Sequence, residues 1–387
     1  MTCRECRQRR KFVQHRPRRL TTLMGSIRYE RPYYSGCVCG GGWTPLDDSL
    51  RLVDQLTWGA AELVTLHGNL CSFDEAAKKA LPRTSGLRVS PATVRRVTEG
   101  IGGDMGCRQQ AGEVFGDPQP WEWETDRHGK RCCYLSLDAT GVRQQAADHS
   151  RAEGRMAWVG AVFNPPPVED PRRERLAKAR YVSGLLSLPE LGHRLRREAE
   201  QVGLATADVV IGLCDGGNGL AECLIEKVLP GVPQQVELIL DFYHASEHVC
   251  AFASAWKADD ESASQLADRW CHTLKHSGGR VLLAELEALD LTGRSPLVCE
   301  EHRRLCGYLG NNLYRTDYPR YRANGWQIGS GTIESACKTI VNGRLNGTGM
   351  RWSEPGTDRL CHVRALFKSE PSAWHHYWQH PPPHLTA

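Results

Sequence analysis

Three short, largely apolar runs each lead directly into an aspartate, and this pattern constrains the fold more than any other feature. The aspartates that follow runs 133–137, 209–214 and 236–240 are Asp138, Asp215 and Asp241. A fourth carboxylate, Glu334, opens a later helical pattern. Parallel buried strands place their carboxyl ends at one edge of a sheet, so acids that follow them meet there. The sequence therefore predicts that distant carboxylates converge in space, as a pair of Mg²⁺ ions needs.

The order of patterns after residue 131 predicts an α/β fold. Strands are expected at 132–138, 155–163, 208–214 and 235–240, and helices at 188–202 and 217–228. Strands that alternate with helices are typical of a mostly parallel sheet. Residues 245–323 lack strand patterns and predict a helical insertion, whereas the proline-rich basic stretch at 165–180 predicts a loop.

Composition is that of an ordinary globular chain. Its 387 residues are 40% hydrophobic and 24% charged, enough for two or three domains. The longest apolar runs fall well short of the roughly 18 residues of a membrane span, and no secretory signal opens the sequence. These features predict a cytoplasmic protein whose scattered cysteines are reduced.

Two cysteine pairs predict a small metal-binding module at residues 1–45. Cys3 and Cys6 form a C-x-x-C pair, and Cys37 and Cys39 form a C-x-C pair about thirty residues later. Four thiolates at this separation are typical of a structural Zn²⁺ site of the ribbon type. The shortened second pair leaves a decayed site as the alternative.

Basic residues indicate where a polyanion would bind. Residues 1–33 hold ten lysines and arginines against two acids, which favours phosphate backbones, with a solvated arm as the alternative. Residues 46–105 show two capped helices joined by a turn, which resembles a helix-turn-helix. Arg95 and Arg96 lie opposite the apolar stripe of the second helix, where they would contact DNA unless the pair is an ordinary helical hairpin.

The densest cluster of polar residues runs from Asp241 to His248. Within it, His244, Glu247 and His248 match the H-x-x-E-H pattern of some zinc proteases. So short a pattern has a high false-positive risk, and the sequence offers no clear third zinc ligand. A zinc hydrolase is therefore a minor alternative.

Together these motifs resemble those of DDE-class transposases of bacterial insertion sequences, most closely the insertion-sequence Kra-four family, which is related to the Mutator-like superfamily. The resemblance covers nearly the whole chain. It rests on Leu137-Asp138-Ala139-Thr140, Glu153-Gly154-Arg155, Cys214-Asp215-Gly216, the segment from Asp241 to His248, Gly329-Ser330-Gly331-x-x-Glu334-Ser335, and Arg344-Leu345-x-Gly347-Thr348-Gly349-Met350-Arg351-Trp352-Ser353. Residues 216–219 stand where the family usually carries a tryptophan-containing segment, which leaves an inactive copy as an alternative.

The resemblance implies an RNase H-like catalytic core with a helical insertion, preceded by a small Cys-rich module and a helical DNA-binding region. The implied domains are a zinc-ribbon-like module at 1–45, a helix-turn-helix-like region at 46–115, the first part of the core at 116–250, the insertion at 251–325, and the catalytic helix with the C-terminal tail at 326–387.

The resemblance also implies that Asp138, Asp215 and Glu334 form the metal-binding catalytic triad. Asp241, His244 and His248 are then accessory residues. Whether Asp215 or Asp241 is the second metal ligand stays open, and Asp215 is favoured because the superfamily places the D-x-x-H pair one strand later.

The implied activity is cleavage and transfer of DNA strands at insertion-sequence ends, with two Mg²⁺ ions that Mn²⁺ can replace. Implied partners are double-stranded DNA, as element ends and target, and further copies of the chain, because transposition joins two ends. Such a protein associates with the nucleoid and not with a membrane. Arg351 and Trp352 are further candidates for DNA contact, with a structural tryptophan as the alternative. An inactive DNA-binding derivative and an RNase H-like nuclease that cuts without joining are the competing functions.

Overall fold

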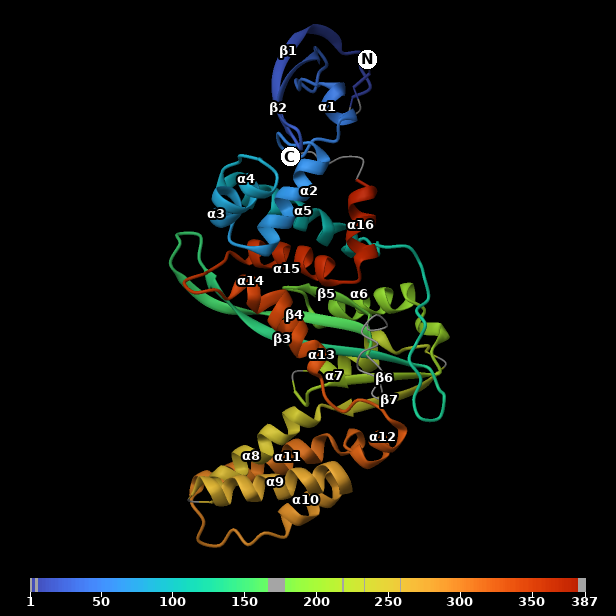
Figure 1. The fold of residues 1–387 in the computed structure, drawn as a ribbon, viewed down its shortest axis with the longest axis vertical. Helices are drawn as coiled ribbons and strands as arrows, with labels where there is room; N and C mark the ends of the chain where they lie inside the picture. The colour runs from blue at the N-terminus through green and yellow to red at the C-terminus, as the bar shows by residue number, and fades with distance from the viewer. Residues whose placement is uncertain are drawn as a thin grey trace. The chain divides into compact units, whose positions relative to one another are not determined.

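The computed structural model describes residues 2–3, 6–165, 178–217, 219–232, 234–257 and 259–381, except for the side chains of Asp48 and Pro371. The predicted basic residue Arg4, most of the predicted proline-rich loop and Asn218 lie outside these ranges. The chain divides into two compact units (Figure 1). The smaller comprises the chain up to Gly116, Arg359–Phe367 and the residues from Pro371, and the larger comprises Asp117–Asp358 and Lys368–Glu370. The five predicted domains divide the chain more finely and remain predictions.

The larger unit is built on a five-stranded sheet of order β5-β4-β3-β6-β7. The strands are β3 (Cys132–Gln145), β4 (Arg151–Asn164), β5 (Lys178–Gly184), β6 (Val209–Cys214) and β7 (Gln235–Leu240). β3, β4 and β5 pair antiparallel, whereas β6 pairs parallel with β3 and with β7. The fold is thus mixed α/β, and the prediction of a mostly parallel sheet is wrong. A short turn joins β3 to β4, which permits only antiparallel pairing, while helices separate the parallel strands.

Helices make up most of the remaining larger unit. They are α6 (Leu188–Gln201), η3 (Leu204–Thr206), α7 (Leu220–Cys223), η4 (Leu224–Val228), α8 (Phe242–Trp256), α9 (Asp260–Ser277), α10 (Gly279–Glu287), α11 (Pro296–Asn311), η5 (Leu313–Arg315), α12 (Tyr318–Asn324), α13 (Gly331–Ala336), η6 (Cys337–Asn342), α14 (Gly343–Leu345) and α15 (Glu354–Lys368), the last of which has residues in both units. From α8 to α12 the described chain contains helices and no strand, as the sequence predicts for 245–323.

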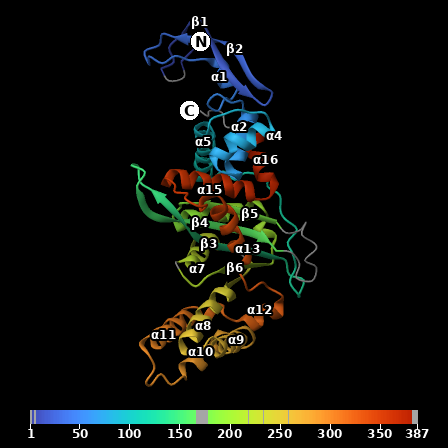
Figure 2. The ribbon, with the colours of Figure 1, turned by 60° about the vertical axis from the view of Figure 1, so that its left-hand side comes forward.

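The two faces of the sheet have different neighbours (Figure 2). Leu135 and Leu137 of β3 belong to one buried cluster with Leu191 of α6. Because side chains alternate along a strand, Asp138 points to the opposite face. There the thiol of Cys337 in η6 donates to its carboxylate. The sheet thus separates an apolar core from the face that carries the acid.

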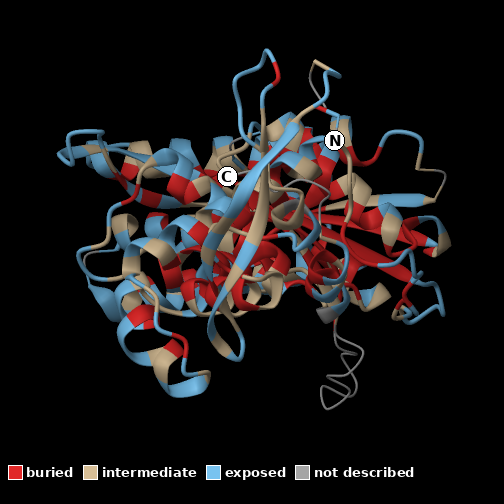
Figure 3. Cartoon of the chain, turned by 90° about the horizontal axis from the view of Figure 1, so that it is seen from above, coloured by how far each residue is buried: buried red, intermediate tan, exposed pale blue. Residues whose placement is uncertain are grey.

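The smaller unit begins with an antiparallel hairpin, which Figure 3 shows as mostly exposed or intermediate in burial. Its strands and the helix that follows are β1 (Lys11–Thr22), β2 (Gly25–Ser35) and α1 (Pro45–Ser49). Asp47 accepts hydrogen bonds from Arg18 at 2.6 Å and from the Tyr29 hydroxyl at 2.7 Å, and it also pairs with Arg31. Most of the predicted basic stretch is therefore a folded ribbon rather than a solvated arm.

Segments from distant parts of the sequence form the helical core of the smaller unit. The helices wholly within it are α2 (Trp58–Leu70), α3 (Phe73–Glu75), η1 (Ala76–Ala80), α4 (Leu81–Thr84), α5 (Pro91–Gln110) and α16 (Pro371–Gln379). The Trp58 indole donates to the carbonyl of Trp378 at 2.6 Å, and the Tyr377 hydroxyl donates to Asp104 at 2.9 Å. In the described part of the chain, no helix has the length and apolar character to cross a membrane.

Candidate functional site

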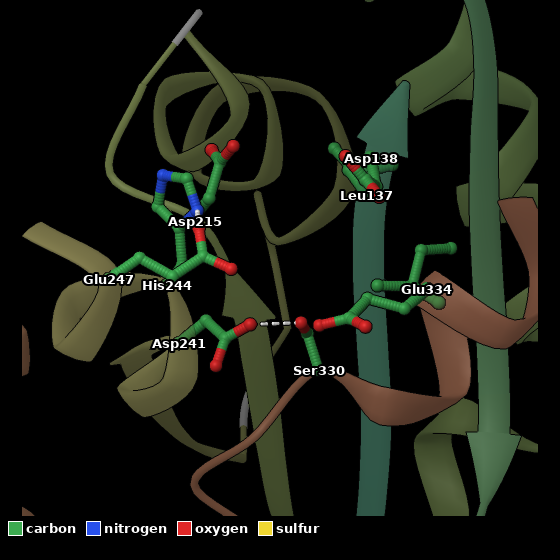
Figure 4. Close-up of a pocket in the computed structure, with 9 residues that line it drawn as sticks. Leu137, Asp138, Asp215, Asp241, His244, Glu247, Ser330 and Glu334 are labelled. Atoms are coloured by element: carbon green, nitrogen blue, oxygen red, sulfur yellow. Dashed lines mark hydrogen bonds and ion pairs between the residues drawn. The ribbon is translucent and has the colours of Figure 1, made fainter. Parts of the chain in front are cut away.

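One hollow of the larger unit collects most of the acids that the sequence singles out (Figure 4). It is lined by Leu137, Asp138, Asp215, Asp241, His244, Glu247, Ser330, Ile333 and Glu334. These residues come from β3, the turn after β6, the start of α8 and the α13 region. The predicted triad and two of the predicted accessory residues, Asp241 and His244, therefore line the same hollow.

Asp138 lies within β3 rather than at its end, because the strand continues to Gln145. The expected strand end at residue 138 is wrong, since the hairpin with β4 carries the pairing onward, with Asp138 opposite Val159. On the other side, the parallel register with β6 stops at Ser136 opposite Leu213. Asp138 thus lies just past the last pair shared with β6, where the sheet opens.

The surroundings of Asp138 disfavour its charged form. Burial raises its pKa above the ordinary 3.8, and the charges of Asp215 and Glu334 raise it further. Two donors oppose this effect: the Ala139 N–H at 2.7 Å and the Cys337 thiol at 3.4 Å. A carboxylate that is crowded by other carboxylates is stabilised when a cation binds beside it.

Asp215 directly follows β6, and a buried arginine holds its turn. The Asp215 Oδ1 atom accepts the Gly217 N–H at 3.1 Å. Arg315 donates to the carbonyl oxygen of Asp215 at 2.8 Å and lies 3.2 Å from the sulfur of Cys214. Because these contacts go to a backbone oxygen and a sulfur, Arg315 orients the turn that presents the carboxylate.

Asp241 is the most enclosed acid of the hollow, with 2% of its surface exposed. It caps α8, since Oδ1 accepts the Tyr243 N–H at 2.8 Å, and its Oδ2 accepts the hydroxyl of Ser330. Both oxygens thus take part in hydrogen bonds that hold α8 and the segment before α13. Asp241 is tied into the fold more tightly than Asp215.

Glu334 lies in the first turn of α13, with 46% of its side chain exposed. Figure 4 shows its carboxylate extending from the helix toward the other acids. Lys338 lies 3.6 Å from it, but the lysine side chain is 73% exposed, and such a pair contributes little. Glu334 therefore remains available to a ligand in the hollow.

The H-x-x-E-H residues divide between the hollow and its surroundings. His244 and Glu247 line it and lie 3.4 Å apart, whereas the ring of His248 packs on Tyr308 with centroids 4.2 Å apart. Burial, aided by the charge of His244, lowers the pKa of His248. Among the described residues, only the cysteine cluster brings three or more metal-ligating atoms within 4.8 Å of one another. His248 thus lies outside the lining of the hollow, and the zinc hydrolase stays a minor alternative.

The lining of the hollow carries negative charge that its own residues do not neutralise. Of the nine residues, five are carboxylates, one is a histidine and none is a lysine or arginine. Carboxylate oxygens are the ligands that Mg²⁺ and Mn²⁺ prefer, so the residues fit a divalent cation. Their spacing is wide, because no three of them meet the 4.8 Å limit in the described chain.

The four N-terminal cysteines form a second and much tighter cluster. The sulfur atoms of Cys3, Cys6, Cys37 and Cys39 all lie within 4.8 Å of one another. Arg10 donates to Cys3 at 3.0 Å and to Cys37 at 3.3 Å, and this charge would offset that of the thiolates. The cluster could bind a metal ion such as Zn²⁺, for which four thiolates are a common ligand set.

The predicted DNA-contact arginines of α5 already have partners. Arg95 pairs with Glu99 at 2.8 Å, and Arg96 pairs with Asp54. The caps that define this helix pair are as predicted, with Ser90 accepting the Thr93 N–H at 3.1 Å. These ion pairs hold the two guanidinium groups against their own unit.

The two other predicted DNA contacts lie in the larger unit and differ in exposure. Arg351 is exposed, whereas Trp352 is 9% exposed and its indole donates to the carbonyl of Leu345 at 2.8 Å. These contacts favour the structural interpretation of Trp352.

Sequence reasoning missed Ser330, Arg315 and Arg10 as supporting residues. Ser330 belongs to the Gly329-Ser330-Gly331 motif, and its two flanking glycines indicate that the backbone lies close to another part of the structure. Arg10 had only its proximity to Cys6 as a signal, and no local pattern distinguishes Arg315, which acts on a turn far away in the sequence.

Neither a scan against protein-family models nor a search among curated proteins finds a match for this chain.

Proposed function

We propose that this protein is a transposase of the DDE class, similar to the Kra-four family, in which Asp138, Asp215 and Glu334 hold divalent metal ions. The observation that carries the proposal is the arrival of these carboxylates, from three separate segments, in one hollow whose lining has no lysine or arginine. The motifs of the sequence, in the order of that family, support it independently.

An RNase H-like core is the fold proposed for the larger unit. Its support is the mixed sheet, with one acid on the central strand β3, one after the neighbouring β6, and a glutamate on α13. The helices α8 to α12 are then the insertion between β7 and the glutamate helix.

Two Mg²⁺ ions in such a site would activate the attacking oxygen and stabilise the leaving 3′-oxygen of DNA. The residues of the chain supply position and charge. β3 fixes Asp138, Arg315 orients the turn that carries Asp215, and α13 extends Glu334. Asp241 is proposed as a structural cap because both of its oxygens are engaged. That assignment leaves Asp215 as the second ligand.

The partners follow from the reaction. Strand transfer requires two element ends and a target duplex, so the working assembly would be a dimer or larger on DNA. A Zn²⁺ ion at the cysteine cluster would be structural, because four protein ligands leave it no open position.

The test is Mg²⁺-dependent cleavage of a DNA fragment that carries the flanking element ends. Asp138→Asn, Asp215→Asn and Glu334→Gln should each lower the rate by about 10³-fold, roughly 4 kcal/mol of activation free energy. Asp241→Asn should keep most of the activity. The control is Asp290→Asn, since this exposed acid only caps a loop after α10.

Two other results would replace the proposal. DNA binding without cleavage by any variant would indicate an inactive DNA-binding derivative. Cleavage without joining of strands would indicate an RNase H-like nuclease.

A further inference from the structure

Two arginines face each other across the N-terminal hairpin. Arg19 of β1 is in register with Arg28 of β2, and both side chains are exposed. Within the described residues, neither guanidinium has an ion-pair or hydrogen-bond partner. Like charges directly opposite each other destabilise an antiparallel pair. The hairpin thus places two like charges at opposite positions, and a bound anion would relieve their repulsion.

The arginines on the other face of the hairpin have partners within the smaller unit. Arg18 and Arg31 share Asp47, and Arg16 lies over the ring of Tyr33 at 3.4 Å. All three are partly buried. Because positions alternate between the faces of a strand, these inward arginines serve the fold, and the outward pair is left for another role.

The remainder of the hairpin gives the outward pair little neutralising charge. The one acid of residues 11–35, Glu30, lies opposite Pro17 on the same face as Arg19 and Arg28, so two outward arginines stand against one acid. Phe12 and Val13, at the open end of the ribbon, are 50% and 52% exposed. The outer face therefore keeps a small excess of positive charge, with exposed apolar side chains at one end.

We propose that this outer face docks on double-stranded DNA, with Arg19 and Arg28 on its phosphates. A two-stranded ribbon is one of the shapes that the major groove, about 12 Å wide, admits. Strands of 12 and 11 residues extend about 36 Å at roughly 3.3 Å per residue, close to one turn of duplex. The choice of DNA over another polyanion rests on the proposed function.

Charge complementarity also separates this surface from the two helical arginines predicted from sequence. Arg95 and Arg96, whose side chains are 51% and 59% exposed, would only exchange weak surface ion pairs for phosphate contacts. Arg19 and Arg28 would instead lose a mutual repulsion on binding. The ribbon is therefore the better DNA contact of the smaller unit.

The test measures binding of the full chain to a mixed-sequence DNA duplex of about 30 base pairs, by fluorescence anisotropy, between about 50 and 200 mM salt. Arg19→Gln/Arg28→Gln should lower the slope of log affinity against log salt by about 2, one for each phosphate contact. Arg19→Lys/Arg28→Lys should keep the slope.

The matched control is Arg303→Gln/Arg304→Gln, which removes the same charge from α11, where the arginines pair with Glu300 and Glu301. It should leave the slope unchanged. A second readout needs no DNA: the Arg19→Gln/Arg28→Gln chain should melt at or above the wild-type temperature, because the repulsion is gone.

An unchanged slope for Arg19→Gln/Arg28→Gln, or no duplex binding by the wild type, would overturn the ribbon proposal. Tighter, Arg19-dependent binding to an RNA duplex of equal length would also overturn it and make the surface an RNA site. The transposase proposal fails on a different result: the wild type shows no Mg²⁺-dependent cleavage, or cleavage persists in Asp138→Asn, Asp215→Asn and Glu334→Gln.

Discussion

The two candidate metal centres of this chain are built in opposite ways. The cysteines lie outside the paired strands, two before β1 and two after β2, yet their sulfur atoms lie within 4.8 Å of one another. The carboxylates of the hollow stand on or next to elements fixed by a buried sheet, and they are spread more widely. A metal ion at the cluster would therefore organise its segment, whereas the carboxylates of the hollow are held by the buried sheet and repel one another.

The largest effect should come from removing the metal of the cluster. Chelation of zinc-loaded protein should speed amide hydrogen exchange in β1 and β2 by about 100-fold or more, near 2.7 kcal/mol, because metal binding supplies folding free energy and an isolated hairpin is marginal. Removing Mg²⁺ should change exchange in β3 and β6 by less than about tenfold.

Two cysteine variants provide the controls for this experiment. Cys37→Ser should reproduce the metal-free exchange, and Cys250→Ser, at an exposed cysteine outside the cluster, should not. Equal protection of β1 and β2 with and without zinc would remove the contrast between the two centres.

The next largest effect is a loss of stability when the hydrogen bond between Ser330 and Asp241 at the hollow is removed. Ser330→Ala leaves one oxygen of the buried Asp241 without its donor, so the free energy of unfolding in urea should fall by about 2 kcal/mol. Ser335→Ala, at an exposed position of α13, should change it by less than about 0.5 kcal/mol. If Ser330→Ala weakens the free energy of metal binding by more than it lowers the free energy of unfolding, Asp241 would instead be a metal ligand.

The two centres should also differ in how their metal affinity depends on pH, which is a smaller effect. The pKa of Asp138 is raised in the folded chain, so the stability that its neutral form contributes is present at low pH and is lost as pH rises through the raised pKa. A cation needs the ionised form, so Mn²⁺ affinity of the hollow should rise by up to about tenfold per pH unit across that range. Zinc at the cluster would displace protons from thiols rather than from carboxyl groups, so its pH profile should differ. Calorimetric titration at several pH values measures both, and identical profiles would contradict the assignment.

The smallest effect is a change in stability, which should have opposite signs for substitutions at the two centres. Asp138→Asn removes one of several repelling charges, so the metal-free chain should gain about 1 kcal/mol and melt about 2–4 °C higher. Cys37→Ser should lower the stability of zinc-loaded protein. Differential scanning calorimetry measures both changes, and destabilisation by Asp138→Asn would mean that its hydrogen bonds outweigh the repulsion.

The features predicted correctly from sequence are those encoded by neighbouring residues. Apolar runs followed by acids anticipated the hollow, and the serines at 72 and 90 anticipated two helix caps. The cysteine spacings anticipated a cluster that is complete despite its shortened second pair.

The features that were not predicted from sequence depend on pairing between distant segments. The mixed sheet follows from the β3–β4 hairpin, and β5 begins within the predicted loop, where proline and arginine obscured a strand pattern. Arg315 and Ser330 act on residues about 100 and 89 positions away, a relation that no local spacing reveals.

The composition of the smaller unit has a consequence for synthesis on the ribosome. Trp58 and Asp104 form hydrogen bonds with Trp378 and Tyr377 of α16, so α2 and α5 cannot complete their core until that helix emerges. Between Gln110 and Pro371 the chain takes on the order of 10 to 50 seconds to synthesise at roughly 5–20 residues per second. During that interval the larger unit can fold, while the apolar sides of α2 and α5 stay open to chaperones and proteases.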